Sequence, residues 1–223
     1  MSISEKLETI KRELPADVEL VAVSKFHPES DIMEAYRVGQ RAFGENIAQE
    51  LHSKALSMPK DIRWHFIGHL QRNKVKMIAP FVSMIQGVDS AFLLDVINKE
   101  ALKAGKKIDC LLQIHVAKEE SKFGLSFEEC RSLLADGKWR GLAGVRLCGL
   151  MCIATNTQDE GEVSREFRLM GDFFNEVKQA HFADEESFSV RSWGMSGDYR
   201  LAIASGCNMV RIGTAIFGSR PVR

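Results

Sequence analysis

The sequence predicts an α/β fold in which eight parallel strands alternate with helices and close into a single (β/α)8 barrel, also called a TIM barrel. Eight short apolar strand candidates follow one another, each preceded by a helical stretch of roughly eight to twenty residues, a pattern typical of right-handed parallel crossovers. The length of 223 residues is at the small end for such barrels. The rival architecture, an open doubly wound sheet, usually has a glycine-rich turn after its first strand, where this chain has Ser24-Lys25-Phe26-His27-Pro28. Because no linker or internal repeat interrupts the pattern, we expect one domain over residues 1–223.

The first half of the chain carries four strand candidates. Ser2 with Glu5 makes a capping box, and apolar residues then recur at helical spacing until Pro15 ends the helix. Short apolar runs predict strands at 20–23, 42–43, 64–67 and 82–85. Helical spacing predicts helices at 31–39, 47–56 and 70–78, the first of them ended by Gly39.

The second half repeats the alternation. Ser90 and Ser126 are expected to cap helices at 90–104 and 126–134, and Gly105 closes the first of these. One apolar face predicts a long helix at 162–182, and a shorter helix is expected at 198–205. The remaining strands are predicted at 108–116, 144–150, 188–191 and 208–212.

The composition excludes several classes of protein. Thirty Lys and Arg residues balance thirty Asp and Glu residues, which argues against a nucleic-acid-binding protein. The sequence shows no secretory signal and no apolar run of the roughly 18 residues that a membrane span needs. The five cysteines are scattered and suit reduced thiols, and no cluster of potential ligands has metal-site spacing. We therefore expect a soluble cytoplasmic protein without a metal.

Function in a barrel resides at the carboxyl ends of the strands, and the first strand ends at Lys25. Partial burial there would lower the pKa of the lysine amine and make it a nucleophile for aldehydes. The alternative is a lysine that extends along the strand end to water.

The last two strands are followed by candidate phosphate-binding loops. Ser196 can cap the helix that follows it, and Gly213 and Thr214 provide a flexible turn after strand eight. Such pairs are also ordinary turn residues. Combined with Lys25, they describe a ligand with an aldehyde and a phosphate, either pyridoxal 5′-phosphate (PLP) or a sugar phosphate. Arg211 favours PLP, because arginine offers only donors and would face an unprotonated ring nitrogen.

Six segments carry a resemblance to a known family: 23–25, 44–46, 64–74, 149–151, 194–198 and 211–218. They resemble the YggS/PROSC family of pyridoxal phosphate homeostasis proteins, in the family's order and over nearly the whole chain. The sequence departs from the family's more frequent residues at His115 and at Cys207-Asn208, which affects the wall of the site and not the main contacts.

The resemblance implies the barrel of the alanine racemase N-terminal domain, a fold-type III PLP protein, with PLP held as a Schiff base on Lys25. It implies phosphate contacts from Ser196, Gly213 and Thr214, and Arg211 at the ring nitrogen. It also implies that Asn46, His65 and Met195 line the cofactor pocket.

We expect a PLP-binding regulator or carrier without robust catalysis of its own, which maintains intracellular PLP and vitamin B6 pools and supplies PLP-dependent enzymes. Related racemases use a tyrosine from a second domain, and this sequence shows no such domain, so we also expect a monomer. One alternative is a weak amino-acid racemase that uses Tyr199 or His65 as its second base. The others are an aldolase that uses Lys25 directly on a sugar phosphate, and an interaction module with a vestigial pocket.

Overall fold

Eight parallel strands form the centre of the molecule in a computed structural model that describes residues 1–119 and 123–219. Neighbours pair in the order β1 to β8, and β8 pairs with β1, so the sheet closes into a barrel. The predicted fold class is thus confirmed. The strands are β1 (Glu19–Val23), β2 (Ala42–Glu45), β3 (Arg63–Phe66), β4 (Val82–Val88), β5 (Ile108–Ile114), β6 (Val145–Cys152), β7 (Val190–Met195) and β8 (Met209–Ile212).

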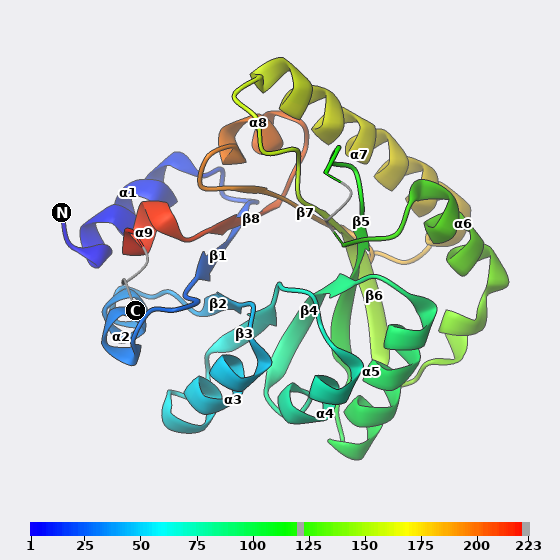
Figure 1. Ribbon diagram of the computed structural model, residues 1–223, viewed down its shortest axis with the longest axis horizontal. Coiled ribbons are helices and arrows are strands. Elements are labelled where there is room, and N and C mark those ends of the chain that lie inside the picture. Colours follow the sequence, from blue (N-terminus) through cyan, green and yellow to red (C-terminus); the bar gives the residue numbers. More distant parts are fainter. Residues whose placement is uncertain (120–122, 220–223) are drawn as a thin grey trace.

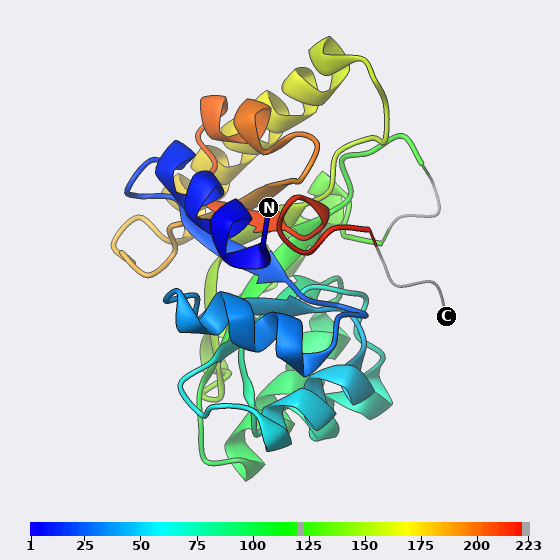
Figure 2. The same cartoon turned by 90° about the vertical axis from the view of Figure 1, so that its left-hand side faces the viewer.

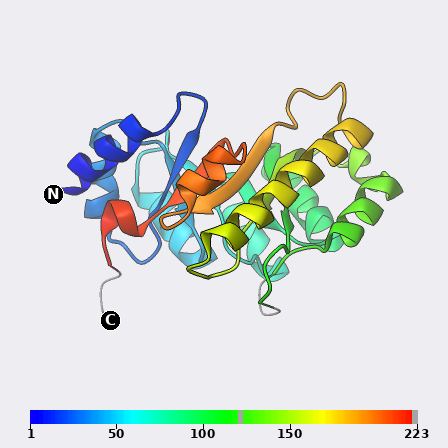
Figure 3. The same ribbon diagram turned by 90° about the horizontal axis from the view of Figure 1, so that it is seen from above.

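Helices surround the strands on the outside of the barrel (Figure 1). Helix α9 lies beside α1, so that the two ends of the described chain meet (Figures 1 and 2). The long α7 packs on β6 and β7 and next to α8 (Figure 3). The helices are α1 (Ile3–Glu13), α2 (Glu29–Arg37), α3 (Ala48–Ser57), α4 (Val75–Ile78), α5 (Ala91–Lys103), α6 (Phe127–Asp136), α7 (Glu160–His181), α8 (Tyr199–Ala204) and α9 (Thr214–Phe217), with 3₁₀ turns η1 (Arg72–Lys74) and η2 (Lys138–Gly141).

Side-chain caps begin several helices where the sequence predicts them. The Ser2 hydroxyl accepts from the Glu5 N–H at 3.2 Å, and the Glu5 carboxylate accepts from the Ser2 N–H at 2.8 Å. Ser126 makes the same box with Glu129, and the Ser90 hydroxyl accepts from the N–H of the third residue of α5. These bonds satisfy N–H groups that have no partner inside the helix.

The core has two layers. The larger lies between the strands and the helices and includes the fully buried Trp193, Phe167 and Phe174. The smaller fills the barrel with Val21, Ala42, Met84, Leu111, Cys148, Met151 and Met209. Because both faces of the sheet are covered, the strands read as nearly continuous apolar runs, which is why the sequence reveals them.

Four predicted elements differ clearly from the structure. The helix expected at 70–78 is reduced to η1 and the single turn of α4. Strands β4 and β7 extend beyond the predicted 82–85 and 188–191 to Val88 and Met195, because pairing with neighbours and not apolar character decides where a barrel strand ends. The turn expected at Gly213 and Thr214 instead begins α9, with Gly213 as its N-cap.

All five cysteines are free and buried. Within 1–119 and 123–219, no three His, Cys, Asp or Glu side chains are grouped so that they could hold a metal ion. Nor does any helix in that part of the chain have the length and apolar character to cross a membrane.

Candidate ligand-binding site

A pocket of about 320 Å³ opens at the carboxyl end of the barrel. Its volume lies at the lower end of the range of roughly 300–1,000 Å³ for small-molecule sites. Seven of the eight predicted site residues line it: Lys25, Asn46, Met195, Ser196, Arg211, Gly213 and Thr214. Six further lining residues are not among the predicted site residues, namely Val23, His27, Ile67, Ile153, Gly197 and Gly218. Three of these, Ile67, Ile153 and Gly197, follow directly on a strand end or adjoin a predicted residue, and that position is the signal that could have found them.

Lys25 lies two residues beyond the end of β1, in a turn and not in the strand itself. The Ser24 N–H donates to the Gly44 carbonyl of β2 at 3.0 Å, and the His27 N–H donates to the Ser24 carbonyl at 3.1 Å. The turn is therefore attached to the barrel rim, and its lysine is partly buried at the pocket wall.

The loops after β7 and β8 meet at the pocket. The Ser196 hydroxyl accepts from the Gly213 N–H at 3.2 Å, which ties the two loops together. The prediction that Ser196 caps the following helix is wrong, because Asp198 is the N-cap of α8 and its carboxylate instead accepts from the Met195 N–H.

Backbone donors are available in the same two loops. None of the described residues accepts a hydrogen bond from the N–H groups of Gly197, Thr214 or Ala215. A side chain at position 213 would crowd β1, since a Cβ there would lie 3.1 Å from the Val23 carbonyl oxygen. The absence of a side chain keeps the backbone open to a ligand, and unpaired N–H groups of this kind bind anions.

Arg211 places a buried positive charge in the pocket. Only 4% of its surface is exposed, and it donates to the Ser192 carbonyl and hydroxyl at 2.6 Å each and to the Cys152 carbonyl at 2.7 Å. No carboxylate of the described residues forms an ion pair with it. Burial lowers the pKa of Arg211, yet a guanidinium stays charged in proteins. The pocket thus contains a cation that only neutral oxygens hold.

His65 does not line the pocket. It is buried on β3, where its Nδ1 accepts from the Gln86 amide at 3.0 Å, and the Gln86 oxygen accepts from the Ser192 hydroxyl at 2.7 Å. Burial lowers the pKa of His65 to about 3, so its imidazole is neutral at physiological pH. His65 reaches Arg211 only through Gln86 and Ser192, and the structure places it behind the site that the resemblance implied for it.

The two tyrosines of the chain also lie outside the pocket lining. The Tyr199 hydroxyl donates to Glu13 of α1 at 2.8 Å, and the Tyr36 hydroxyl donates to Asp61 at 2.8 Å. Neither of the second bases weighed for a racemase, Tyr199 or His65, therefore borders the space beside Lys25.

Asn46 brings an unsatisfied acceptor to the pocket wall. Its Oδ1 is buried and has no hydrogen-bond partner among the described residues. A buried polar atom without a partner costs free energy, so a ligand that donates a hydrogen bond at this point would relieve that cost. The pocket therefore suits an anionic ligand with both hydrogen-bond donors and acceptors.

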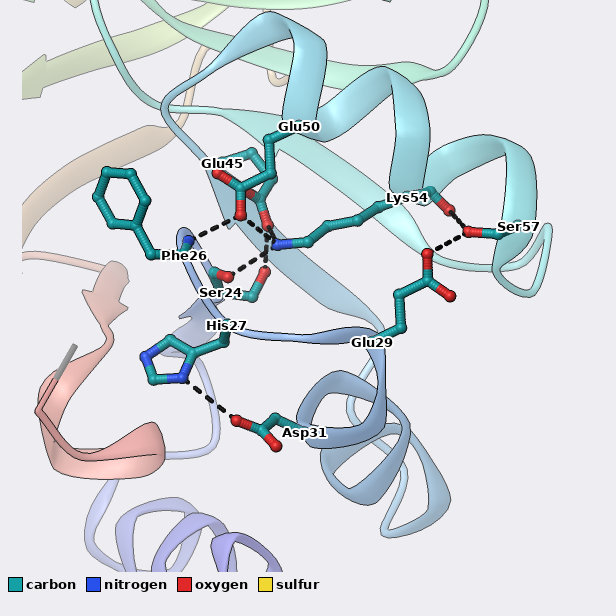
Figure 4. Close-up of polar contacts among 9 residues, drawn as sticks. All are labelled: Ser24, Phe26, His27, Glu29, Asp31, Glu45, Glu50, Lys54 and Ser57. Atoms are coloured by element: carbon teal, nitrogen blue, oxygen red, sulfur yellow. Dashed lines mark hydrogen bonds and ion pairs between the residues drawn. The ribbon is translucent and has the colours of Figure 1, made fainter. Parts of the chain in front are cut away.

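A buried carboxylate lies behind the turn of Lys25. Glu45, at the end of β2, accepts from the Ser24 hydroxyl at 2.6 Å and from the Lys54 ammonium at 2.8 Å (Figure 4). Burial raises the pKa of Glu45 to about 7, although Lys54 and Ser24 oppose this shift and the nearby Glu50 adds to it. This carboxyl group is thus close to its midpoint of ionisation at neutral pH.

Glu45→Gln is expected to flatten the pH dependence of the free energy of unfolding between about pH 5 and pH 8. The pKa of Glu45 is higher in the folded chain than its ordinary value of 4.5, so its contribution to stability is fully present below pH 4.5 and is lost as the pH rises through about 7. Glutamine has the shape of the protonated acid and no proton to lose. We expect the curves of wild type and variant to diverge by on the order of 2–3 kcal/mol in urea unfolding, and parallel curves would contradict this.

Comparison with known proteins places this geometry in context. The profile of the family "Alanine racemase, N-terminal domain" matches residues 1–221. A pyridoxal phosphate homeostasis protein of Haemophilus influenzae is 38% identical over 224 aligned positions, which cover 98% of this chain and 93% of that protein. The protein of the same name from Homo sapiens is 37% identical over 94% of this chain and 79% of its own length.

Solved structures show the same barrel. PipY of Synechococcus elongatus without PLP is 34% identical and superposes with a TM-score of 0.90, covering 97% of this chain and 100% of PipY. PipY with PLP bound is 33% identical with a TM-score of 0.87 over the same shares. An alanine racemase from Bartonella henselae with covalently bound PLP, 17% identical with a TM-score of 0.72 over 99% of this chain and 60% of the racemase, shares the fold.

Proposed function

This chain belongs to the alanine racemase N-terminal domain family and, within it, to the pyridoxal phosphate homeostasis proteins, and from that premise we propose that it binds PLP in the barrel pocket and serves intracellular PLP and vitamin B6 homeostasis. One observation carries the proposal. A single pocket is lined by a lysine, by backbone N–H donors and by a buried arginine, and within residues 1–119 and 123–219 the donors have no acceptor and the arginine has no carboxylate partner. These are the groups that a ligand with an aldehyde, a phosphate and a ring nitrogen requires.

Each residue has a distinct part in the proposal. PLP supplies an aldehyde, which Lys25 would hold as a Schiff base. The N–H groups of Gly197 and Thr214 and the loop fastened by Ser196 and Gly213 would bind the phosphate. Arg211 would donate to the ring nitrogen and thereby keep it unprotonated.

Two other predicted residues of the pocket wall, Asn46 and Met195, also have a part in the proposal. The Asn46 carbonyl oxygen would accept a hydrogen bond from the ring hydroxyl, which would satisfy an acceptor that has no partner in the described protein. Met195, of which 37% is exposed, would cover the ring with an apolar side chain at the rim.

We propose a carrier or regulator and not an efficient enzyme. A racemase needs a second base opposite the lysine, and Tyr199 is engaged with Glu13 while His65 lies behind the pocket with Gln86. The names of the relatives, which describe homeostasis and not a reaction, support the same view. The five buried thiols suit a cytoplasmic protein, and we propose that it acts there as a monomer that supplies PLP to PLP-dependent enzymes.

The proposal is tested by titrating the purified chain with PLP at neutral pH. We expect an absorbance band near ~420 nm from the lysine–aldehyde adduct, which borohydride should convert to a stable amine that peptide mapping locates at Lys25. Incubation with D- or L-alanine should produce no efficient racemisation. A chain that stays colourless with PLP would contradict the proposal and turn attention to Lys25 as a nucleophile for a sugar phosphate.

A further inference from the structure

The turn that carries Lys25 has an unusual backbone conformation. Phe26, the residue after the lysine, has a φ of +67°. Within residues 1–119 and 123–219, it is the only non-glycine residue with a positive φ. A bulky L-residue is disfavoured in the left-handed region, because its Cβ approaches the backbone too closely. Contacts elsewhere in the fold must therefore hold this turn.

Glu50 on α3 provides one such contact. Its Oε1 accepts a hydrogen bond from the Phe26 N–H at 2.7 Å (Figure 4). A charged acceptor makes a hydrogen bond stronger than a neutral pair does. Glu50 therefore holds the strained residue directly, from a helix that is itself packed against the barrel.

Lys54, one turn later on α3, connects both sides of the lysine turn. Its ammonium donates to the Ser24 carbonyl at 2.9 Å, to Glu45 at 2.8 Å and to Glu50 at 2.7 Å. Ser24 precedes Lys25 and Phe26 follows it, so the residues on both sides of the lysine are bonded to one buried group of charges. Figure 4 shows these bonds converging on the ammonium.

This buried network of charged groups contributes little net free energy to the stability of the fold. Glu45 is fully buried, Lys54 is 6% exposed, and the second oxygen of Glu45 has no partner among the described residues. Desolvation offsets much of the attraction in such a pair, and apolar side chains of the same volume often stabilise as well. Charged groups instead contribute directional hydrogen bonds, and the bonds to the turn each fix the position of a particular backbone atom. Neither carboxylate nor the Lys54 ammonium borders the ligand pocket, so any effect on a ligand must be indirect, through lining residues such as Lys25.

We propose that Glu50 is a positioning residue for Lys25: with Lys54 as its partner, it holds the turn from Ser24 to Phe26 so that the Lys25 amine meets its ligand at the pocket wall. This inference rests on the proposed function, because the ligand that Lys25 meets is taken to be PLP. Glu50 acts through the backbone of the turn and has no contact with the ligand.

Glu50→Ala tests the proposal, since alanine removes the acceptor for the Phe26 N–H. We expect the PLP concentration at half-saturation of the ~420 nm band to rise about tenfold. In the chain without PLP, we expect hydrogen exchange of the Phe26 amide, measured by NMR, to become faster by about tenfold, because its hydrogen bond is lost. The second readout needs no ligand.

Two matched variants separate positioning from a general loss of stability. Glu50→Gln keeps a carbonyl oxygen for the Phe26 N–H and should restore both readouts to within about threefold of wild type. Ser57→Ala, on the same helix, removes a hydrogen bond to Glu29 of α2 that does not touch the turn. It should leave both readouts at wild-type values, because the bond it removes lies on the exposed side of α3.

Wild-type affinity in Glu50→Ala, equal weakening in Ser57→Ala, or a Glu50→Gln variant as weak as Glu50→Ala would overturn the inference. Failure of the proposed function has a different signature, since wild type would then form no band with PLP. In that case the exchange rate of the Phe26 amide still decides whether Glu50 holds the turn.

Discussion

Replacing Lys25 by alanine is expected to abolish the absorbance band that wild type forms with PLP and to prevent any trapping by borohydride. Alanine has no amine that could condense with an aldehyde, so covalent attachment is lost completely. The loops proposed to bind the phosphate and Arg211 are unchanged in the variant, so weaker non-covalent binding should remain. Thermal stability should stay close to that of wild type, because Lys25 is only partly buried and lies outside the core.

Two further variants serve as controls for Lys25→Ala. Lys25→Arg keeps a positive charge at the pocket wall but offers no neutral nitrogen near physiological pH, and it should also fail to form the band. Lys60→Ala removes a lysine whose ammonium donates to two carbonyls at the end of α3, away from the pocket, and it should form the band as wild type does. A band that persists in Lys25→Ala would show that another amine holds PLP.

Gly149→Ala is expected to have the largest effect on folding. Gly149 lies in β6 with a φ of +155°, and a Cβ at this position would lie 1.8 Å from the Val190 carbonyl oxygen in β7. Gly149 pairs with Val190 across the two strands, and a closed barrel gives β7 no room to withdraw without loss of neighbouring pairs. We expect a loss of more than about 4 kcal/mol, a large share of the roughly 5–15 kcal/mol that stabilises a typical protein.

Denaturant unfolding measures this effect, with Gly171→Ala as the comparison. Gly171 lies inside α7, and a Cβ there would meet only the Ser205 carbonyl at 3.5 Å, an ordinary contact distance. Because alanine has a higher helix propensity than glycine, we expect the free energy of unfolding of this variant to rise by about 0.5–1 kcal/mol. A Gly149→Ala chain that unfolds within about 1 kcal/mol of wild type would mean that β6 and β7 can separate locally.

Sequence reasoning reached the ligand pocket because of the way a parallel barrel is built. Lys25, Asn46 and Ser196 follow strands that are far apart in the sequence, yet the carboxyl ends of parallel strands all lie on one side of the barrel. A residue that follows a strand is therefore a candidate for that side without any knowledge of its neighbours. Their roles toward PLP remain predictions, as does the single domain over residues 1–223.

The same reasoning could not place residues whose position depends on partners from other strands. His65 was expected in the pocket, but its ring contacts Gln86, on a neighbouring strand, inside the barrel. Ser196 was expected to cap α8, but its hydroxyl meets Gly213 from the next strand. Both outcomes depend on register and on the direction of single side chains, which closure of the sheet decides.

The sequence by itself determined the alternation of strands and helices and the closed barrel. It also determined the order in which Lys25, Arg211 and the loops of Ser196 and Gly213 occur at or next to strand ends. Apolar periodicity and caps are local properties, so they are readable from neighbouring residues. Only the tertiary structure decided that Glu45, Glu50 and Lys54 converge behind Lys25 and that Arg211 has no carboxylate partner among the described residues. These contacts join β2 to α3, and β8 to β6 and β7. Which residues meet over such separations in the sequence depends on how whole elements pack, and no short stretch of sequence contains that information.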